Sequence, residues 1–225
     1  MDSIVAGIAR ALSSDVDTLG LISQNVANMQ TPGYLTRHAS RSSFAAGLPQ
    51  APVLDLAQGA MKHTGQPLDL AVQGNAFFTI EAGGQTLLTR NGEFHIDGQG
   101  RLVTASGFPV LGDAGPITVS GTAIKILADG QIEDGGRVID RLHIVSVSDP
   151  QKLVPAGEGL YGYTGALTPW KGAIQVGALE QSNVDPGSEM VRLIEITRHA
   201  QSLQHAMYAY DEALQTGINH LGDNS

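Results

Sequence analysis

Near its beginning the chain reads DSIVAGIARALSSDVDTLGLISQNVANM (residues 2–29), and apolar side chains recur there at every third or fourth position. The same spacing returns near the other end, from residue 193 onward. A helix turns once in about 3.6 residues, so this spacing gathers the apolar side chains on one narrow face and predicts two helices. We call this face of each helix the seam, and its residues are Val5, Ile8, Leu12, Leu19, Ile22, Val26 and Met29 in the first helix and Leu193, Ile196, Ala200, Leu203, Met207, Tyr210 and Leu214 in the second.

Between the two helices the apolar pattern changes to a period of two. Segments such as 71–80 and 142–147 alternate, and turn sequences such as Asn91-Gly92 and Asp97-Gly98 separate the segments. Asn-Gly and Asp-Gly favour hairpins because these residues tolerate positive φ. The pattern therefore predicts an α+β protein, with paired, coiled-coil-like N- and C-terminal helices and a central all-β domain of short antiparallel strands.

Helix-breaking and helix-capping residues give the boundaries of these parts. Pro32 and Gly33 stop the first helix, whereas Asp185 is a suitable N-cap for the second, with Pro186 at its first position. The stretch before residue 68 mixes small and polar residues without clear periodicity, which is typical of an extended linker. The predicted parts are the N-terminal helix at 1–34, the linker between subunits at 35–67, the β domain at 68–178 and the C-terminal helix, paired with the first, at 179–225.

One acidic residue, Asp15, falls on the seam of the first helix. Such a carboxylate is either a register device at an exposed point of a helix pair or a sign that the seam faces a mixed polar and apolar surface. The second interpretation is favoured. Amphipathic helices usually pack on the core of their own domain. Here the β domain closes without them and their opposite faces are rich in small and polar residues, so we favour packing against other subunits.

The composition excludes several classes of function. The net charge of −9 with only 13 scattered basic residues argues against nucleic-acid binding. The chain has no cysteine, and no stretch is long and apolar enough for direct membrane insertion. The first residues lack the pattern of a cleaved secretory signal, so we expect that any export proceeds without such cleavage.

Catalytic and metal-binding patterns are also missing from the sequence. It has no Gly-x-Ser-x-Gly elbow and no phosphate-binding Gly-rich loop with Lys. His199 and His205 are six residues apart and fall on different helix faces, so no metal site is expected. Carboxylates such as Asp69 and Glu93 could supply an acid/base pair, but most carboxylates sit beside glycines, where turn stabilisation is favoured. We therefore predict neither enzymatic activity nor a cofactor.

Three motifs in the chain resemble those of the bacterial flagellar rod and hook proteins. The first is NVANMQTPGY at residues 25–34, the second is LDLAVQG at 68–74 with the downstream TRNGEF at 89–94, and the third is GALEQSNVD at 177–185. The chain departs from the commonest pattern at Met29-Gln30 and at His199-Ala200, where an aromatic residue often follows Arg. The motif residues singled out are Asn25, Asn28, Thr31, Pro32, Gly33, Tyr34, Ser182, Asn183, Glu189 and Met190.

The resemblance implies a structural subunit of the flagellar basal-body rod, the drive shaft that carries torque from motor to hook across the periplasm. Implied partners are copies of the chain, the other proximal and distal rod proteins, the flagellar type III export apparatus and the surrounding ring bushing. The short length and the segment 115–132 most resemble the proximal-rod branch of the family, with the distal-rod branch as the near competitor.

Two hypotheses from other classes are weighed against this one. A soluble β-domain binding module that dimerises through its helices would form a discrete, stable oligomer, whereas a rod subunit would be a monomer with mobile ends until it is incorporated. A hydrolase that uses Asp69 or Glu93 is the weakest of the three hypotheses. It predicts that replacing either residue abolishes activity without harming assembly.

Overall fold

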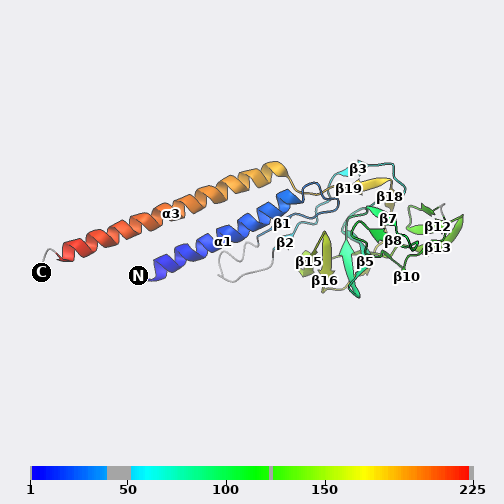
Figure 1. The fold of residues 1–225 in the computed structure, drawn as a ribbon, viewed down its shortest axis with the longest axis horizontal. Helices are drawn as coiled ribbons and strands as arrows, with labels where there is room; N and C mark the ends of the chain where they lie inside the picture. Colours follow the sequence, from blue (N-terminus) through cyan, green and yellow to red (C-terminus); the bar gives the residue numbers. More distant parts are fainter. Residues whose placement is uncertain (1, 40–51, 122–123, 223–225) are drawn as a thin grey trace. The chain divides into compact units, whose positions relative to one another are not determined.

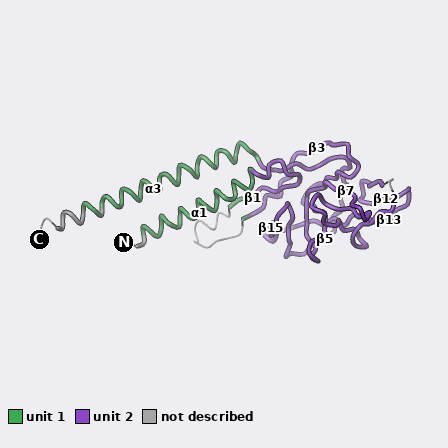
Figure 2. The backbone as a smooth tube through the Cα atoms, in the orientation of Figure 1, with its two compact units in different colours: residues 1–26, 37–52, 185–225 green, residues 27–36, 53–184 purple. Residues whose placement is uncertain are grey.

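The protein is described by a computed structural model that covers residues 2–39, 52–121 and 124–222. The chain divides into two compact units, shown in different colours in Figure 2. We call Met1–Val26, Arg37–Pro52 and Asp185–Ser225 the helix unit, and Ala27–Thr36 with Val53–Val184 the β unit. This division confirms the coarse α+β prediction, with terminal helices and a central β-rich region.

In the helix unit, α1 (Asp2–Ala27) and α3 (Pro186–Gly222) lie side by side and run in opposite directions (Figure 1). Helix α1 ends two residues before the predicted Met29, and the backbone N–H of Thr31 then donates to Asn28 O across a turn. The predicted start of α3 is confirmed. Pro186 is its first residue, and the Asp185 carboxylate accepts from the Gly187 N–H at 3.1 Å and from the Ser188 hydroxyl at 2.6 Å.

The described strands are short, and all their pairings inside the β unit are antiparallel. Their bounds are β1 (Arg37–His38), β2 (Val53–Leu54), β3 (Met61–His63), β4 (Leu70–Val72), β5 (Ala76–Ala82), β6 (Gln85–Thr89), β7 (Phe94–Ile96), β8 (Leu102–Thr104), β9 (Leu111–Gly112), β10 (Gly115–Pro116), β11 (Ile124–Ile126), β12 (Gln131–Asp134), β13 (Arg137–Arg141), β14 (Ile144–Ser146), β15 (Leu153–Gly157), β16 (Leu160–Tyr163), β17 (Thr168–Pro169), β18 (Ile174–Val176) and β19 (Ala178–Glu180), with a short 3₁₀ helix η1 (Pro150–Lys152) before β15.

The main sheet of the β unit has the strand order β15-β16-β6-β5-β14-β17, and a smaller sheet is formed by β11, β12 and β13. The hairpin of β5 and β6 is central, with Phe78 opposite Thr89 and Ile80 opposite Leu87. Its side chains point alternately into two apolar clusters: Phe78 and Ile80 contribute to one, whereas Phe77 contributes to the other. The β unit therefore contains its own core on both sides of β5.

The core consists mainly of aliphatic side chains, as the low aromatic content predicts. Its few rings form specific pairs. Phe78 and Phe94 meet edge to face at 5.1 Å between ring centroids, and Phe77 and Tyr161 do so at 6.0 Å. Such pairs stabilise a core by about 0.5–1.5 kcal/mol beyond the area they bury.

The β unit is wider than the range 68–178 that the alternating pattern predicts. Tyr34, Leu35 and Leu54 are buried in it, and β2 and β3 fall inside the range 35–67 predicted as a linker. Strands of two or three residues are too short to show a period in the sequence, which explains why this part has no visible pattern. Residues 40–51 of the predicted linker lie outside the described residues.

The N-cap of α3 gives a first prediction. Hydrogen bonds from the Ser188 hydroxyl and the Gly187 N–H lower the pKa of Asp185 from its ordinary value of 3.8. The charged cap therefore stabilises α3 above that ordinary value, and the contribution is lost as the pH falls through the lowered pKa. Asp185→Ala should speed amide exchange at residues 187–189 at neutral pH. Asp185→Asn should keep the cap but remove its acid dependence, and equal exchange in all three proteins at pH 7 would contradict the assignment.

Candidate functional site: helix faces and motif network

Only two of the seven predicted seam residues pack inside the helix unit, and Met29, which lies beyond the end of α1, is 39% exposed. Ile22 is buried and Ile8 half-buried, whereas Val5, Leu12, Leu19 and Val26 form a row along α1, seven residues apart, that is 37–42% exposed. We call this second set the open row. The open row lies on a face of α1 beside the one that packs in the helix unit. The packed face continues instead through the small or polar residues Ala11, Thr18 and Asn25. The continuous coiled-coil seam expected from sequence is therefore split between a packed face and an open one.

The seam of α3 is better covered than that of α1. Leu193, Ile196, Ala200, Leu203 and Tyr210 are half-buried, Met207 is exposed, and the side chain of Leu214 lies outside the description. Further apolar side chains, which the seam analysis missed, are exposed beside it, and these are Met190, Val191, Ile194 and Tyr208. A scan for apolar residues on the predicted polar face would have found them. Exposed apolar rows of this length mark a surface for other proteins.

Asp15 and His199 meet in the middle of the helix pair, a contact that sequence reasoning did not predict. The Asp15 side chain is only 6% exposed, and His199 Nδ1 lies 2.8 Å from Oδ2 and 2.9 Å from Oδ1 of this carboxylate. Ser14 and Thr18, both half-buried, flank Asp15 on the packed face of α1. Asp15 is buried rather than at an exposed point.

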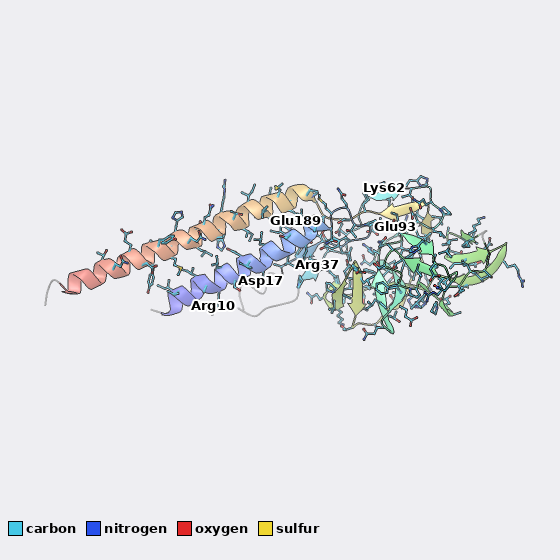
Figure 3. The ribbon with its side chains drawn as sticks, in the orientation of Figure 1. Arg10, Asp17, Arg37, Lys62, Glu93 and Glu189 are labelled. Carbon is cyan, nitrogen blue, oxygen red and sulfur yellow. The ribbon has the colours of Figure 1, made fainter. Side chains whose placement is uncertain are left out.

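Two motif residues organise the end of the helix unit where α3 begins. The Asn25 side-chain amide pairs with the backbone of Arg37 as a neighbouring strand would: its Nδ2 donates to Arg37 O at 2.9 Å, and its Oδ1 accepts from the Arg37 N–H at 3.0 Å. The Glu189 side chain is buried and accepts from Arg192 Nη1 at 3.0 Å, while the same Nη1 lies 2.8 Å from His38 Nδ1. Figure 3 labels Arg37 and Glu189 at this end of the helix unit, and Arg10 and Asp17 farther along α1.

In the β unit, the third motif supplies one half of a buried ion pair. Arg90 Nη1 lies 3.1 Å from Glu180 Oε1, and both side chains are almost fully buried. Glu180 Oε1 also accepts from the Gly59 N–H, and the Arg90 guanidinium donates to the carbonyls of Leu56, Gly74 and Ala76 and lies over the Phe77 ring. Burial raises the pKa of Glu180, and Arg90 opposes that shift; burial likewise lowers the pKa of Arg90.

The Thr31-Pro32-Gly33-Tyr34 motif packs directly against this ion pair. Gly33 has φ +67°, its N–H donates to Glu180 O at 2.8 Å, and a Cβ there would lie 2.4 Å from the backbone of Arg90. Only glycine fits both the conformation and the space. The next residues follow Gly33 into the core: Tyr34 is buried, and the Leu35 N–H donates to the Tyr161 hydroxyl at 3.2 Å.

Asn183 joins three segments of the β unit. Its Oδ1 accepts from the N–H and the hydroxyl of Thr36, both at 2.7 Å, and its Nδ2 donates to the carbonyls of Asp55 and Ala57 at 2.9 and 2.8 Å. The amide group thus uses all of its hydrogen-bonding capacity. Ser182 supports it by accepting from the Val184 N–H, and Asn28 accepts from the Thr31 hydroxyl near the first motif.

The carboxylates weighed as catalytic groups take structural positions. Asp97 accepts from the N–H groups of Arg101 and Gln99, and these bonds, with the Arg101 side chain, lower its pKa. Asp69 and Glu93 face each other in a β-bridge, where the Asp69 carbonyl accepts from the Gly177 N–H. Among the described residues no group of three or more His, Asp or Glu could hold a metal ion. Within the same ranges, no helix is long and apolar enough to span a bilayer.

Comparison with known families agrees with this architecture. Residues 71–134 match the family model of the flagellar hook protein FlgE/F/G D1 domain, and residues 175–220 match that of the flagellar basal body rod FlgEFG protein C-terminal region. The first match covers much of the β unit, and the second covers the end of that unit with most of α3. Fold and matches together define a structural protein of the flagellar axis.

Curated relatives define the family more closely. The chain is 30% identical to the flagellar basal-body rod protein FlgF of Caulobacter vibrioides over 98% of both chains, and 29% identical to FlgF of Salmonella typhimurium over 94% of this chain and 95% of that one. It is also 29% identical to the rod protein FlgG of Bacillus subtilis, over 88% and 83% of the two chains. The chain belongs to the flagellar basal-body rod protein family and is a structural subunit of the rod.

The Arg90–Glu180 pair gives the second prediction. Glu180→Gln leaves the Arg90 charge buried without its counterion, so the free energy of unfolding of the β unit should fall by about 3–5 kcal/mol. Urea unfolding monitored by the fluorescence of Trp170 measures this change. The control is Asp129→Asn, which removes the exposed partner of Arg141 at 3.7 Å and should change the free energy by less than about 1 kcal/mol. Equal effects of the two substitutions would refute the assigned role.

Proposed function

We propose that the chain is a proximal-rod subunit that assembles helically, with copies of itself and with other rod proteins, through the exposed faces of α1 and α3. The observation that carries this proposal is the open row of Val5, Leu12, Leu19 and Val26. A protein with its own closed core in the β unit does not need these side chains for folding, so their exposure in the single chain favours burial in an assembly.

Assembly through these rows is favourable because apolar burial contributes about 25 cal/mol per Å² and the same contact repeats along a polymer. We expect the open row to pack in knobs-into-holes fashion against the seam residues and the Met190, Val191 and Ile194 side chains of neighbouring subunits. The heptad spacing of the open row supports this coiled-coil packing between subunits. A chain of such contacts transmits torque, because side chains packed at crystal density resist sliding.

The parts of the chain receive roles in this proposal. The predicted N- and C-terminal parts supply α1 and α3 for the inner tube, and the β unit, which also takes in residues 53–67 and 179–184, supplies the outer domain. The subunit belongs to the periplasm-spanning rod, is exported by the type III apparatus without cleavage of a signal, and turns inside the ring bushing. These assignments extend the family resemblance.

Both branches of the family are represented among the relatives. FlgF proteins match over more of the chain than the FlgG protein of Bacillus subtilis does, which favours the proximal branch. The competing idea, a binding module that dimerises through its helices, predicts one discrete oligomer of the purified chain. The rod proposal instead predicts a monomer that polymerises only on an existing rod.

Electron cryomicroscopy of basal bodies tests the proximal assignment. Cells that lack this chain should have a rod that stops below its distal part with its proximal part incomplete, and the complemented strain should have a complete rod and hook. A deletion strain in which the proximal rod is complete and only the distal rod is missing would move the chain to the distal branch. An intact rod and hook would overturn the proposal.

The open row has its own test. Leu12→Asp places a charge on the row, and burial of that charge between subunits costs several kcal/mol, so incorporation into the rod and motility should be lost. Ser13→Asp adds the same charge to an exposed position about 100° around the helix and should leave swimming normal. Quantification of the chain in purified basal bodies separates loss of incorporation from loss of expression. Normal incorporation of the Leu12→Asp protein would contradict the proposed interface.

A further inference from the structure

The connection between β6 and β7 contains a dipeptide that is prone to deamidation, Asn91-Gly92. Of the asparagines in the sequence, only Asn91 precedes a glycine. The backbone nitrogen of residue 92 can attack Cγ of the asparagine, and glycine leaves this approach unhindered because it has no Cβ. The new C–N bond closes a succinimide ring, while the side-chain nitrogen takes up the proton of the Gly92 N–H and leaves as ammonia. Water then opens the ring to aspartate or isoaspartate.

Packing requires the glycine of this dipeptide. Gly92 is buried and has no positive φ, unlike Gly83 and Gly84 in the preceding hairpin turn. A Cβ at residue 92 would overlap the carbonyl oxygen of Leu70 and would lie 3.2 Å from Cε2 of Phe78. The fold therefore needs a residue without a side chain directly after Asn91, and the chemical lability of the dipeptide follows from that need.

The folded β unit restrains both reacting groups. The Asn91 side chain is held because its Oδ1 accepts from the Glu93 N–H at 3.0 Å. The Gly92 carbonyl is held because it accepts from the Leu70 N–H at 3.0 Å, and burial of Gly92 keeps away the water that would open the ring. Ring closure requires the side chain and the peptide to rotate together, so the turn must first open. An unfolded chain has none of these restraints.

Isoaspartate at residue 91 would not fit the folded turn. Its main chain runs through the former side chain, so the backbone before Gly92 becomes longer by one methylene group. No room exists for this group where even a Cβ at residue 92 would overlap Leu70. The product also carries a carboxylate at the branch, beside the buried backbone of Arg90 and Gly92. Aspartate keeps the normal main chain and an oxygen that can accept from the Glu93 N–H.

We propose that Asn91 is a deamidation site that the folded β unit protects and the unfolded chain exposes, and that its isoaspartyl product prevents the β unit from folding. A subunit that stays unfolded for too long thereby excludes itself from assembly. That the unfolded chain is the form handled by the export apparatus rests on the proposed function, whereas the chemistry concerns the β unit alone.

Peptide mass spectrometry of the full-length protein, incubated at mildly alkaline pH with and without guanidinium chloride, measures deamidation at residue 91. We expect the folded protein to react at least about tenfold more slowly than the unfolded chain, because only molecules with an opened turn react. The matched control is Gly83→Asn, which creates a second Asn-Gly in the exposed turn between β5 and β6. Residue 83 has φ +59°, which asparagine tolerates, and an added Cβ there meets no atom within 4 Å.

The control site should react at similar rates with and without denaturant. Equal rates at residue 91 in the folded and unfolded chains would overturn the proposal. So would a rate at residue 91 in the folded Gly83→Asn protein that equals the rate at its control site.

Refolding tests the consequence for the subunit. Protein aged in guanidinium chloride contains aspartate and isoaspartate at residue 91, and after dilution a protease removes the chains that remain unfolded. Isoaspartate should be depleted several-fold from the resistant β unit, whereas aspartate should be retained. Equal recovery of both forms would refute the folding step, and so would an Asn91→Asp protein without the folded signal of Trp170. Rod assembly is measured separately with Leu12→Asp, so either proposal can fail while the other stands.

Discussion

The buried Arg90–Glu180 ion pair is the constraint on which the β unit depends. Two opposite charges without access to water are tolerated only when nearly every donor and acceptor finds a partner. Arg90 meets this condition with carbonyls of residues 56, 74 and 76, whereas Glu180 is bonded through Oε1 alone, to Arg90 and the N–H of Gly59, and its buried Oε2 has no hydrogen-bond partner among the described residues. The geometry therefore fixes the loop before β3, the turn before β5 and the strand β19 with respect to one another.

This constraint also explains two of the family motifs. Gly33 must be glycine because it passes against the Arg90 backbone, and its N–H binds the carbonyl of Glu180. Asn183 lies three residues after Glu180 in the chain, and its side chain links Thr36 to the carbonyls of Asp55 and Ala57. The motifs are thus parts of one hydrogen-bonded network inside the β unit. They stabilise the subunit, whereas the surface proposed for assembly consists of the exposed apolar rows on the helices.

The sequence predicted the features that have a local signal. The period of about 3.6 residues gave both helices, Asp185 and Pro186 gave the start of α3, and Asn-Gly and Asp-Gly turns indicated the antiparallel β region. Long-range pairs had no such signal: Arg90 and Glu180 are 90 residues apart, and Asp15 and His199 are 184 apart. The split of the α1 seam was also hidden, because heptad spacing identifies apolar rows without saying which row packs inside the chain and which remains open.

Apolar and polar residues on α1 differ in how they can stabilise a contact with another helix. The Val5, Leu12, Leu19 and Val26 side chains attract any apolar helix face, since the hydrophobic effect has no direction. A buried carboxylate is directional, because the free energy of its burial depends on a donor at one position. Asp15 finds that donor in His199 Nδ1, 2.8 Å from Oδ2, on the packed face of α1. The packed face of α1 is therefore held by a directional contact within the helix unit, whereas the open row is left to the non-directional attraction proposed for neighbouring subunits.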